Sequence, residues 1–206
     1  PPYVPKHAFL DPNEPMSIGT LADPDYYLEA RHDMQVAMEK SIPVIEETCK
    51  EFAEIFGREY GLIDTYKTDD ADIIFVAMGS MCSTLRVMID ELRNKGEKVG
   101  LVSVHLYRPF SAKHFLAAVP KTAKTIAVLD RTKEPGANGE PLYLDVKDCF
   151  YGTENAPVIV GGRYGLGSKD TTPAQIIAIF KNLALPMPKN HFTVGIVDDV
   201  TFTSLP

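Results

Sequence analysis

The sequence lacks the residues that several common kinds of site require. Its 206 residues include no Trp and only three Cys, and no two of these cysteines form a CxxC pair. The five histidines are dispersed and form neither an HxxxH nor an HExxH pattern. A zinc knuckle and a cysteine run for an iron–sulfur cluster are therefore excluded. An odd number of scattered thiols is typical of a reducing compartment.

Long apolar runs and a leader sequence are also missing. No stretch approaches about 18 uninterrupted apolar residues, so no transmembrane helix and no membrane partner are predicted. The chain opens PPYVP, without an initiator Met or the basic and apolar regions of a secretory signal. This opening favours a piece of a longer polypeptide, or a processed one.

Charge is distributed unevenly along the chain. Residues 1–72 carry 16 acidic and 6 basic side chains, whereas residues 73–206 carry 12 acidic and 15 basic ones. The net charge is −7 without a concentrated basic face, which argues against a nucleic-acid-binding protein. The acidic first part is interpreted as a solvated helical face, with an acidic docking surface for a partner as the alternative.

The first third of the chain is predicted to be an extended linker followed by a helical arm. Residues 1–22 are rich in Pro and have no periodicity. Asp23 and Pro24 suit a helix start, because Asp can cap the first turn and Pro needs no N–H there. Helical spacing continues to Gly57, a residue typical of helix ends, and Pro43 is expected to interrupt or restart the helix.

The rest of the chain alternates short apolar runs with helices. This pattern predicts an α/β fold with a doubly wound, mainly parallel sheet covered on both faces. A helix is predicted to begin at Thr172, where Gln175 completes a capping box. The chain is thus divided into a linker plus arm, residues 1–71, and an α/β domain, residues 72–206. Five strands are expected, over residues 73–78, 99–106, 125–129, 157–160 and 192–197.

Candidate binding residues lie after the predicted strands. In open parallel sheets, ligands bind at the carboxyl ends of the strands. Cationic side chains there suit a phosphate or carboxylate group, or a contact with another domain. The structural alternative is that they pair with the nearby Asp130, Glu134 and Asp170. The candidate loop residues are Gly79, Ser80, Arg108, Arg131, Lys133, Gly162, Arg163, Ser168 and Lys169.

No complete nucleotide or nucleophile motif lies in these loops. From Gly162 to Lys169 the Ser and Lys are in the reverse order of a P-loop, and a dinucleotide fingerprint lacks its third Gly. A weaker anion-binding nest and glycines that only permit tight turns both stay open. Ser80 lies in no GxSxG and is expected to be a helix N-cap. Cys82 lies where the helix dipole could lower its pKa, but it has no clear His partner, and His105 is expected to be structural.

Six segments, taken in order, carry a family resemblance. They are VAMGS (76–80), LYRPF (106–110), VLDRTKEPG (128–136), PLYLDV (141–146), GRYGLGSK (162–169) and HFTVGIVDD (191–199). Together they resemble pyruvate:ferredoxin (flavodoxin) oxidoreductase. The similarity is to an interior part of that enzyme, from the end of the first thiamine-binding domain into a second domain like the transketolase C-terminal domain.

The resemblance implies the chemistry of the parent enzyme. That chemistry is thiamine-diphosphate-dependent oxidative decarboxylation of pyruvate to acetyl-CoA, with Mg²⁺, with coenzyme A as co-substrate, and with [4Fe–4S] clusters that pass electrons to ferredoxin or flavodoxin. It also implies a homodimeric parent, in some versions fused to an NADP-reducing module, in the cytoplasm or an anaerobic organelle such as a hydrogenosome.

The chain itself lacks a GDG-type diphosphate motif, so it is expected to bind none of these cofactors and to be inactive alone. No catalytic or metal-binding residue is assigned to it. The expected function is that of a non-catalytic, structural domain that contacts the remaining domains of the parent. The alternative is a self-standing α/β protein that binds a small anion or nucleotide at the strand-end loops.

Overall fold

The computed structural model describes residues 10–17, 19–197 and 200–206. The first nine residues of the predicted linker lie outside the described residues. So do the last two residues of the HFTVGIVDD segment. The chain divides into two compact units, Pro1–Ile42 and Pro43–Pro206. No helix among the described residues is both long enough and apolar enough to cross a membrane.

The arm is one continuous helix, α1 (Pro24–Phe56). It begins as predicted after Asp23, whose backbone carbonyl accepts the N–H groups of Tyr26 and Tyr27, both at 3.0 Å. It ends as predicted before Gly57, which has a φ of 65°. Pro43 lies inside the helix, so the predicted interruption is wrong. One Pro removes a single backbone hydrogen bond, and the helix-favouring residues on both sides continue the helix across it.

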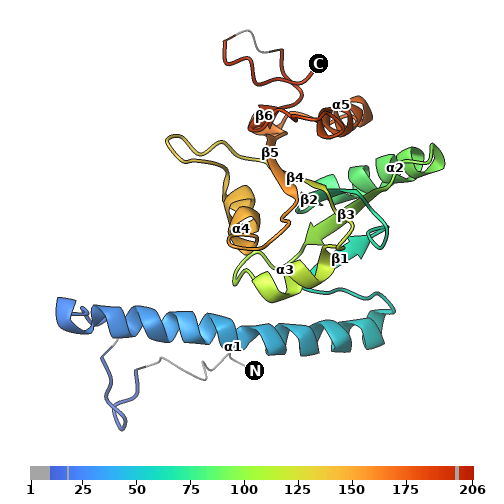
Figure 1. Ribbon diagram of the computed structural model, residues 1–206. Helices are drawn as coiled ribbons and strands as arrows, with labels where there is room; N and C mark the ends of the chain where they lie inside the picture. The colour runs from blue at the N-terminus through green and yellow to red at the C-terminus, as the bar shows by residue number, and fades with distance from the viewer. Residues whose placement is uncertain (1–9, 18, 198–199) are drawn as a thin grey trace. The chain divides into compact units, whose positions relative to one another are not determined.

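The sheet has six strands in the order β1-β3-β2-β4-β5-β6. Only β1 is antiparallel to its neighbour, and the other pairs are parallel, which confirms the predicted α/β class with a mainly parallel sheet (Figure 1). The strands are β1 (Ile63–Tyr66), β2 (Ile73–Ala77), β3 (Val99–Val104), β4 (Thr125–Asp130), β5 (Val158–Arg163) and β6 (Phe192–Thr193).

Two of these strands differ from the prediction. β1 was not predicted, and it brings residues that the sequence analysis placed in the arm into the sheet by pairing with β3. β6 has only two residues, fewer than the predicted strand over residues 192–197. Both are edge strands, and they are held by pairing with a distant neighbour rather than by a long apolar run of their own.

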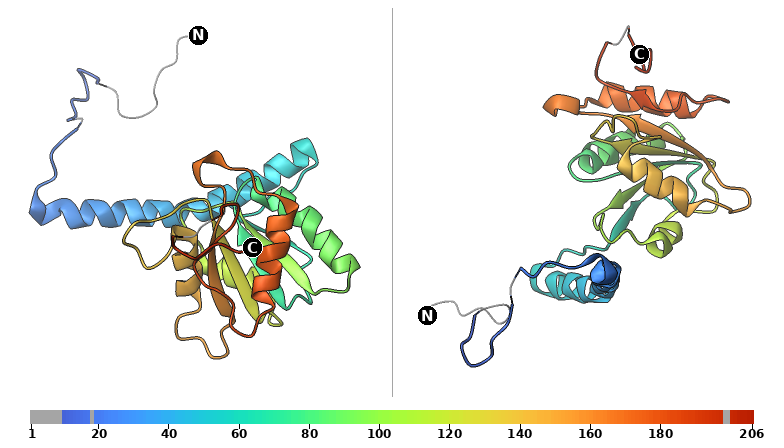
Figure 2. Two further views of the ribbon diagram at one scale, coloured as in Figure 1. Left: turned by 90° about the horizontal axis from the view of Figure 1, so that it is seen from above. Right: turned by 90° about the vertical axis from the view of Figure 1, so that its left-hand side faces the viewer.

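Helices cover both faces of the sheet (Figure 2). One hydrophobic cluster packs α2 (Met81–Asn94) and α5 (Pro173–Leu183) on one face, and a second packs α3 (Ala112–Ala118) and α4 (Pro141–Cys149) on the other. The capping box at the start of α5 is present, and the side chain of Gln175 accepts the N–H of Thr172 at 3.0 Å. Every residue of β3 is buried, as expected for a strand covered on both faces.

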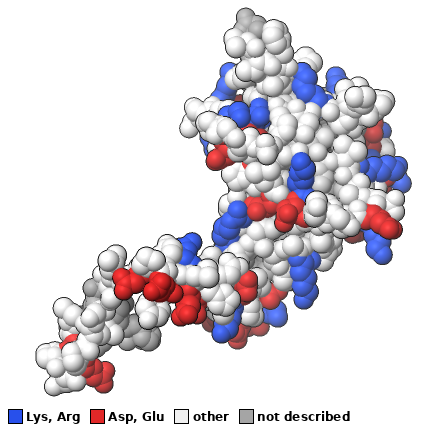
Figure 3. Space-filling model, turned by 60° about the vertical axis from the view of Figure 1, so that its left-hand side comes forward, with Lys and Arg blue, Asp and Glu red and all other residues white. Residues whose placement is uncertain are grey.

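The uneven charge of the sequence is also visible on the surface. In Figure 3, acidic side chains gather along the helical arm, whereas basic and acidic side chains alternate on the α/β unit. On the face shown, the α/β unit thus presents charges of both signs.

Candidate functional site: the carboxyl edge of the sheet

The carboxyl ends of four parallel strands meet at one edge of the sheet. The register pairs Ala77 at the end of β2 with Ser103 in β3, and Asp130 at the end of β4 with Arg163 at the end of β5. The loops that carry the candidate residues therefore emerge from the same edge, which is where ligands bind in sheets of this kind. We call this region the carboxyl edge.

Asp130 anchors one side of this edge. Its side chain is 3% exposed, and its two carboxylate oxygens accept the backbone N–H groups of Leu142, at 3.0 Å, and Tyr143, at 3.1 Å. Burial raises the pKa of Asp130, and these two N–H groups oppose part of that rise. Asp130 therefore caps the first turn of α4 and fixes that helix to the end of β4, instead of pairing with a cation of the loops.

Arg163 and Glu140 form a buried ion pair. The guanidinium Nε donates to Oε1 of Glu140 at 2.7 Å, and Nη1 donates to the backbone carbonyl of His191 at 2.9 Å. Exposure is 9% for the Arg163 side chain and 2% for that of Glu140. Arg163 was a candidate for binding an anion or another domain, but its guanidinium is buried against Glu140 within this domain. The sequence does not reveal Glu140 as its partner, because a strand-end arginine gives no local sign of a buried carboxylate opposite it.

The other cations of the edge are exposed. Arg131 donates its Nε to the carbonyl of Gly165 at 3.1 Å. The Lys133 side chain is 48% exposed, and its Nζ lies 3.8 Å from Oε1 of Glu140. Arg108 is half exposed, pairs with Asp145 at 2.9 Å and stacks on its neighbouring tyrosine. Lys169 is exposed and has no ion pair within the described part of the chain. Arg131, Lys133 and Lys169 are thus the cations that the edge offers to a partner or ligand.

The small residues of the loops have structural roles that differ from one another. Ser80 occupies the N-cap position before α2 as predicted, but its side chain makes no capping hydrogen bond. Gly79 has a φ of 66°, which glycine adopts at little steric cost, and it therefore suits the tight turn before α2. A Cβ atom on Gly162 would overlap the Phe192 ring, so this glycine permits the close packing of β5 and β6. Ser168 is exposed in a short turn with a φ of 63°.

The thiols near the sheet are poor nucleophiles. Cys82 is 8% exposed, and burial raises the pKa of its thiol, so the expected lowering by the helix dipole is wrong. Burial and, to a smaller extent, the carboxylates of Asp148 and Asp145 raise the pKa of Cys149 to about 11. Only a thiolate attacks or binds a metal, so neither group supports covalent chemistry near neutral pH.

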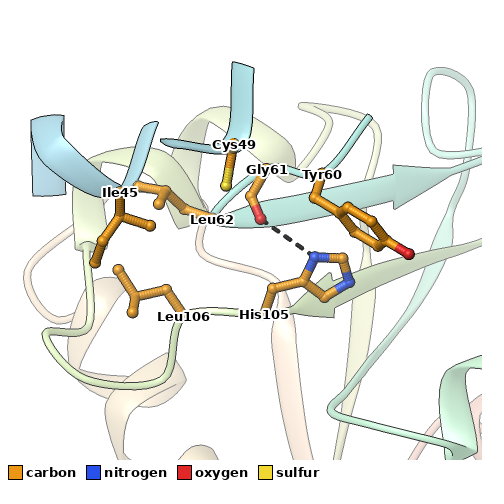
Figure 4. Close-up of a pocket in the computed structure, with 7 residues that line it drawn as sticks. All are labelled: Ile45, Cys49, Tyr60, Gly61, Leu62, His105 and Leu106. Carbon is orange, nitrogen blue, oxygen red and sulfur yellow. Dashed lines mark hydrogen bonds between the residues drawn. The ribbon is translucent and has the colours of Figure 1, made fainter. Parts of the chain in front are cut away.

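A small apolar cavity lies beside the end of β3 (Figure 4). Its volume is about 300 Å³. As expected for a structural histidine, His105 places its Nδ1 3.2 Å from the carbonyl of Gly61 and its Nε2 3.6 Å from Asp64. Both ring nitrogens thus face protein groups rather than the cavity. The cavity is lined by Ile45, Cys49, Tyr60, Gly61, Leu62, His105 and Leu106.

The fold and this edge define an α/β domain of the doubly wound type, in which buried carboxylates hold the strand ends. Comparison with known proteins agrees with that class. The family model described as "Pyruvate:ferredoxin oxidoreductase core domain II" matches residues 71–176, slightly more than half of the chain. The chain belongs to this family.

Several relatives are much longer than this chain. The pyruvate-flavodoxin oxidoreductase of Klebsiella pneumoniae is 51% identical over 197 residues, which are 96% of this chain and 17% of that protein. Pyruvate synthase subunit PorA of Methanothermobacter thermautotrophicus is 47% identical over 186 residues, which are 90% of this chain and 47% of that subunit. A solved structure of 2-oxoglutarate:ferredoxin oxidoreductase from Magnetococcus marinus has a TM-score of 0.48 and 17% identity, covering 77% of this chain and 23% of that chain.

Proposed function

We propose that this chain is a non-catalytic, interdomain α/β domain of a pyruvate:ferredoxin or pyruvate:flavodoxin oxidoreductase. The observation that carries the proposal is the 51% identity to a pyruvate-flavodoxin oxidoreductase over 96% of the chain. The whole enzyme would convert pyruvate and coenzyme A to acetyl-CoA and CO₂ and pass electrons to ferredoxin or flavodoxin. It would act as a homodimer in the cytoplasm or in an anaerobic organelle.

The cofactors of that reaction would be held by other domains. Thiamine diphosphate needs a Mg²⁺ site, and [4Fe–4S] clusters need grouped thiolates. Within the described residues, no group of three or more His, Cys, Asp or Glu side chains could hold a metal ion. The described residues thus offer no such cluster of ligands, and we assign no step of the reaction to this chain.

The proposed task of this domain is to orient the domains that do the chemistry. The carboxyl edge is the surface suited to that task, because its exposed cations lie on loops that the core does not need. Arg131, Lys133 and Lys169 would contact carboxylates or other anionic groups of a neighbouring domain. Arg108 would add to this surface, together with the loops that carry Gly79, Ser80, Gly162 and Ser168.

Two activity measurements test the proposal. A longer polypeptide that carries this sequence should reduce a viologen dye when pyruvate and coenzyme A are both supplied. The 206-residue chain alone should give no reduction and no heat of binding with thiamine diphosphate. Dye reduction by the isolated chain would refute the non-catalytic role. A longer polypeptide that is loaded with its cofactors but inactive on pyruvate would refute the assignment to this reaction.

A further inference from the structure

Glu140 has a buried oxygen that its own fold does not satisfy. Its Oε1 atom accepts the guanidinium of Arg163, but Oε2 has no hydrogen-bond partner among the described residues. The side chain is 2% exposed, so water does not readily compensate. A buried carboxylate oxygen without a donor costs free energy, and such a group is kept for a reason that must be found.

The imidazole of His191 lies close to this oxygen. Its Nδ1 atom lies 4.0 Å from Oε2 of Glu140, just beyond hydrogen-bond distance, and the ring is 37% exposed. The backbone of His191 has a φ of 54°, and Oδ1 of Asn190 accepts its N–H at 2.9 Å. The ring also meets Tyr143 edge-on, with 5.2 Å between the ring centroids. A non-glycine residue in this conformation carries some backbone strain, so the surrounding contacts must hold it there.

Lys133 lies near the same carboxylate. Its Nζ is 3.8 Å from Oε1 of Glu140, and almost half of the side chain is exposed. Lys133 and His191 therefore both lie between a buried carboxylate and solvent. Arg163 matches the charge of Glu140, so Lys133 adds a positive charge that no other acid within the described residues pairs with.

We propose that Lys133 and His191 bind a phosphate group of a ligand, with Glu140 as a positioning residue behind them. The imidazolium form of His191 would donate Nδ1–H to Oε2 of Glu140 and Nε2–H to the ligand, while the ammonium of Lys133 would contact a second ligand oxygen. The inference deepens the proposed role of the carboxyl edge and rests on it. It adds two residues, Glu140 and His191, that the sequence analysis did not single out.

Sulfate is a suitable probe, because it is a tetrahedral oxyanion like a phosphate group. The 206-residue chain would be titrated with sodium sulfate against sodium chloride at matched ionic strength, and resonances of His191 and Lys133 would be followed by NMR. We expect saturable shifts at both residues. Lys133→Met should raise Kd about tenfold. His191→Asn, which tolerates the positive φ, should also raise Kd.

Lys124→Met is the matched control. Lys124 is 75% exposed and pairs with Asp72 at 3.2 Å beside the start of β4, at the opposite edge of the sheet. Its replacement should leave Kd unchanged. Equal effects of the two lysine variants, or shifts of the wild type that do not saturate or that spare His191, would overturn the proposal. Dye reduction by the longer enzyme is not used here, so an active enzyme whose domain binds no sulfate would refute this inference and leave the proposed function standing.

Discussion

Two buried carboxylates with different partners shape the carboxyl edge at the residue scale. Asp130 accepts two backbone N–H groups at the start of α4, whereas Glu140 accepts the guanidinium of Arg163. Breaking either set would leave a buried donor or acceptor unpaired, which costs more than the net value of the bond itself. The inner layer of the edge is therefore structural, and only the outer cations are available to a partner.

Asp130 should make the stability of the chain depend on pH. Burial raises its folded-state pKa above the ordinary value of 3.8, so the folded state binds this proton more tightly than the unfolded chain. The resulting stabilisation is present below 3.8 and is lost as pH rises through the raised folded-state pKa. The difference in free energy of unfolding between the wild type and Asp130→Asn should therefore fall as pH rises across that interval. Urea unfolding of both proteins at a series of pH values measures this difference.

The control for this prediction is Asp170→Asn, at an exposed position in the loop before α5. Its difference from the wild type should show no comparable slope. A difference between the wild type and Asp130→Asn that stayed constant, or that grew as pH rose, would contradict the sign worked out for Asp130.

Cys149 should react slowly with alkylating agents. A pKa of about 11 leaves a far smaller fraction of thiolate near pH 8 than an unperturbed thiol has. We expect its alkylation by iodoacetamide to be on the order of 100-fold slower than that of glutathione. Mass spectrometry of the peptide that contains Cys149 measures the rate in the folded chain. A rate close to that of glutathione would contradict the burial of this thiol, and unfolding in urea should restore it.

At the scale of elements, local sequence was enough to predict a strand that is buried on both faces or a helix that carries its own end signals. β2, β3 and β4 are almost continuous apolar runs because helices cover both sides of them. The start of α5 was readable because Thr172 and Gln175 satisfy backbone groups within one turn.

The elements that local sequence did not predict depend on distant partners. β1 is a four-residue edge strand that forms by pairing with β3. α4 has only nine residues, and its first turn is held by the carboxylate of Asp130 from the preceding strand. Tertiary packing sets both the pairing of β1 and the start of α4, and the pattern of neighbouring residues does not reveal it.

The contact between β5 and β6 gives a prediction at this scale. A methyl group on Gly162 would overlap the ring of Phe192. Gly162→Ala should therefore lower the free energy of unfolding by about 1–3 kcal/mol, because the ring or the strand must move. Urea denaturation measures the loss. In a Phe192→Ala background the same substitution should cost clearly less, and an equal cost in both backgrounds would contradict steric overlap as the cause.

At the scale of the whole molecule, topology determined the position of the candidate residues and packing determined which of them are accessible. A parallel sheet gathers its strand-end loops at one edge, so the sequence alone placed Arg131, Lys133 and Lys169 there. It could not distinguish them from Arg163, because the difference is made by Glu140, 23 residues away in the sequence. Burial, rather than residue type, separates the part of the edge that stabilises the fold from the part that faces outward.

The last prediction concerns that outward part. Arg131 and Lys169 are exposed, and exposed charges contribute only about 0–1 kcal/mol each to stability. Arg131→Glu combined with Lys169→Glu should therefore hardly change the melting temperature of the 206-residue chain. In the longer enzyme the same charges would meet another domain, where losing one partner of a buried charge pair can cost roughly 2–5 kcal/mol. Assembly, measured by sedimentation, and dye reduction with pyruvate should both decline.

The matched control reverses two cations at the opposite edge, Lys121→Glu and Lys124→Glu. It makes the same change in net charge, so it separates a specific contact from a general electrostatic effect. Equal losses of assembly with both double variants would indicate net charge alone as the cause. A large fall in the melting temperature of the isolated chain would show that Arg131 and Lys169, like Arg163, stabilise the fold. An interdomain surface at the carboxyl edge requires two results for the Arg131→Glu, Lys169→Glu variant. The isolated chain must stay stable, and the longer enzyme must assemble poorly.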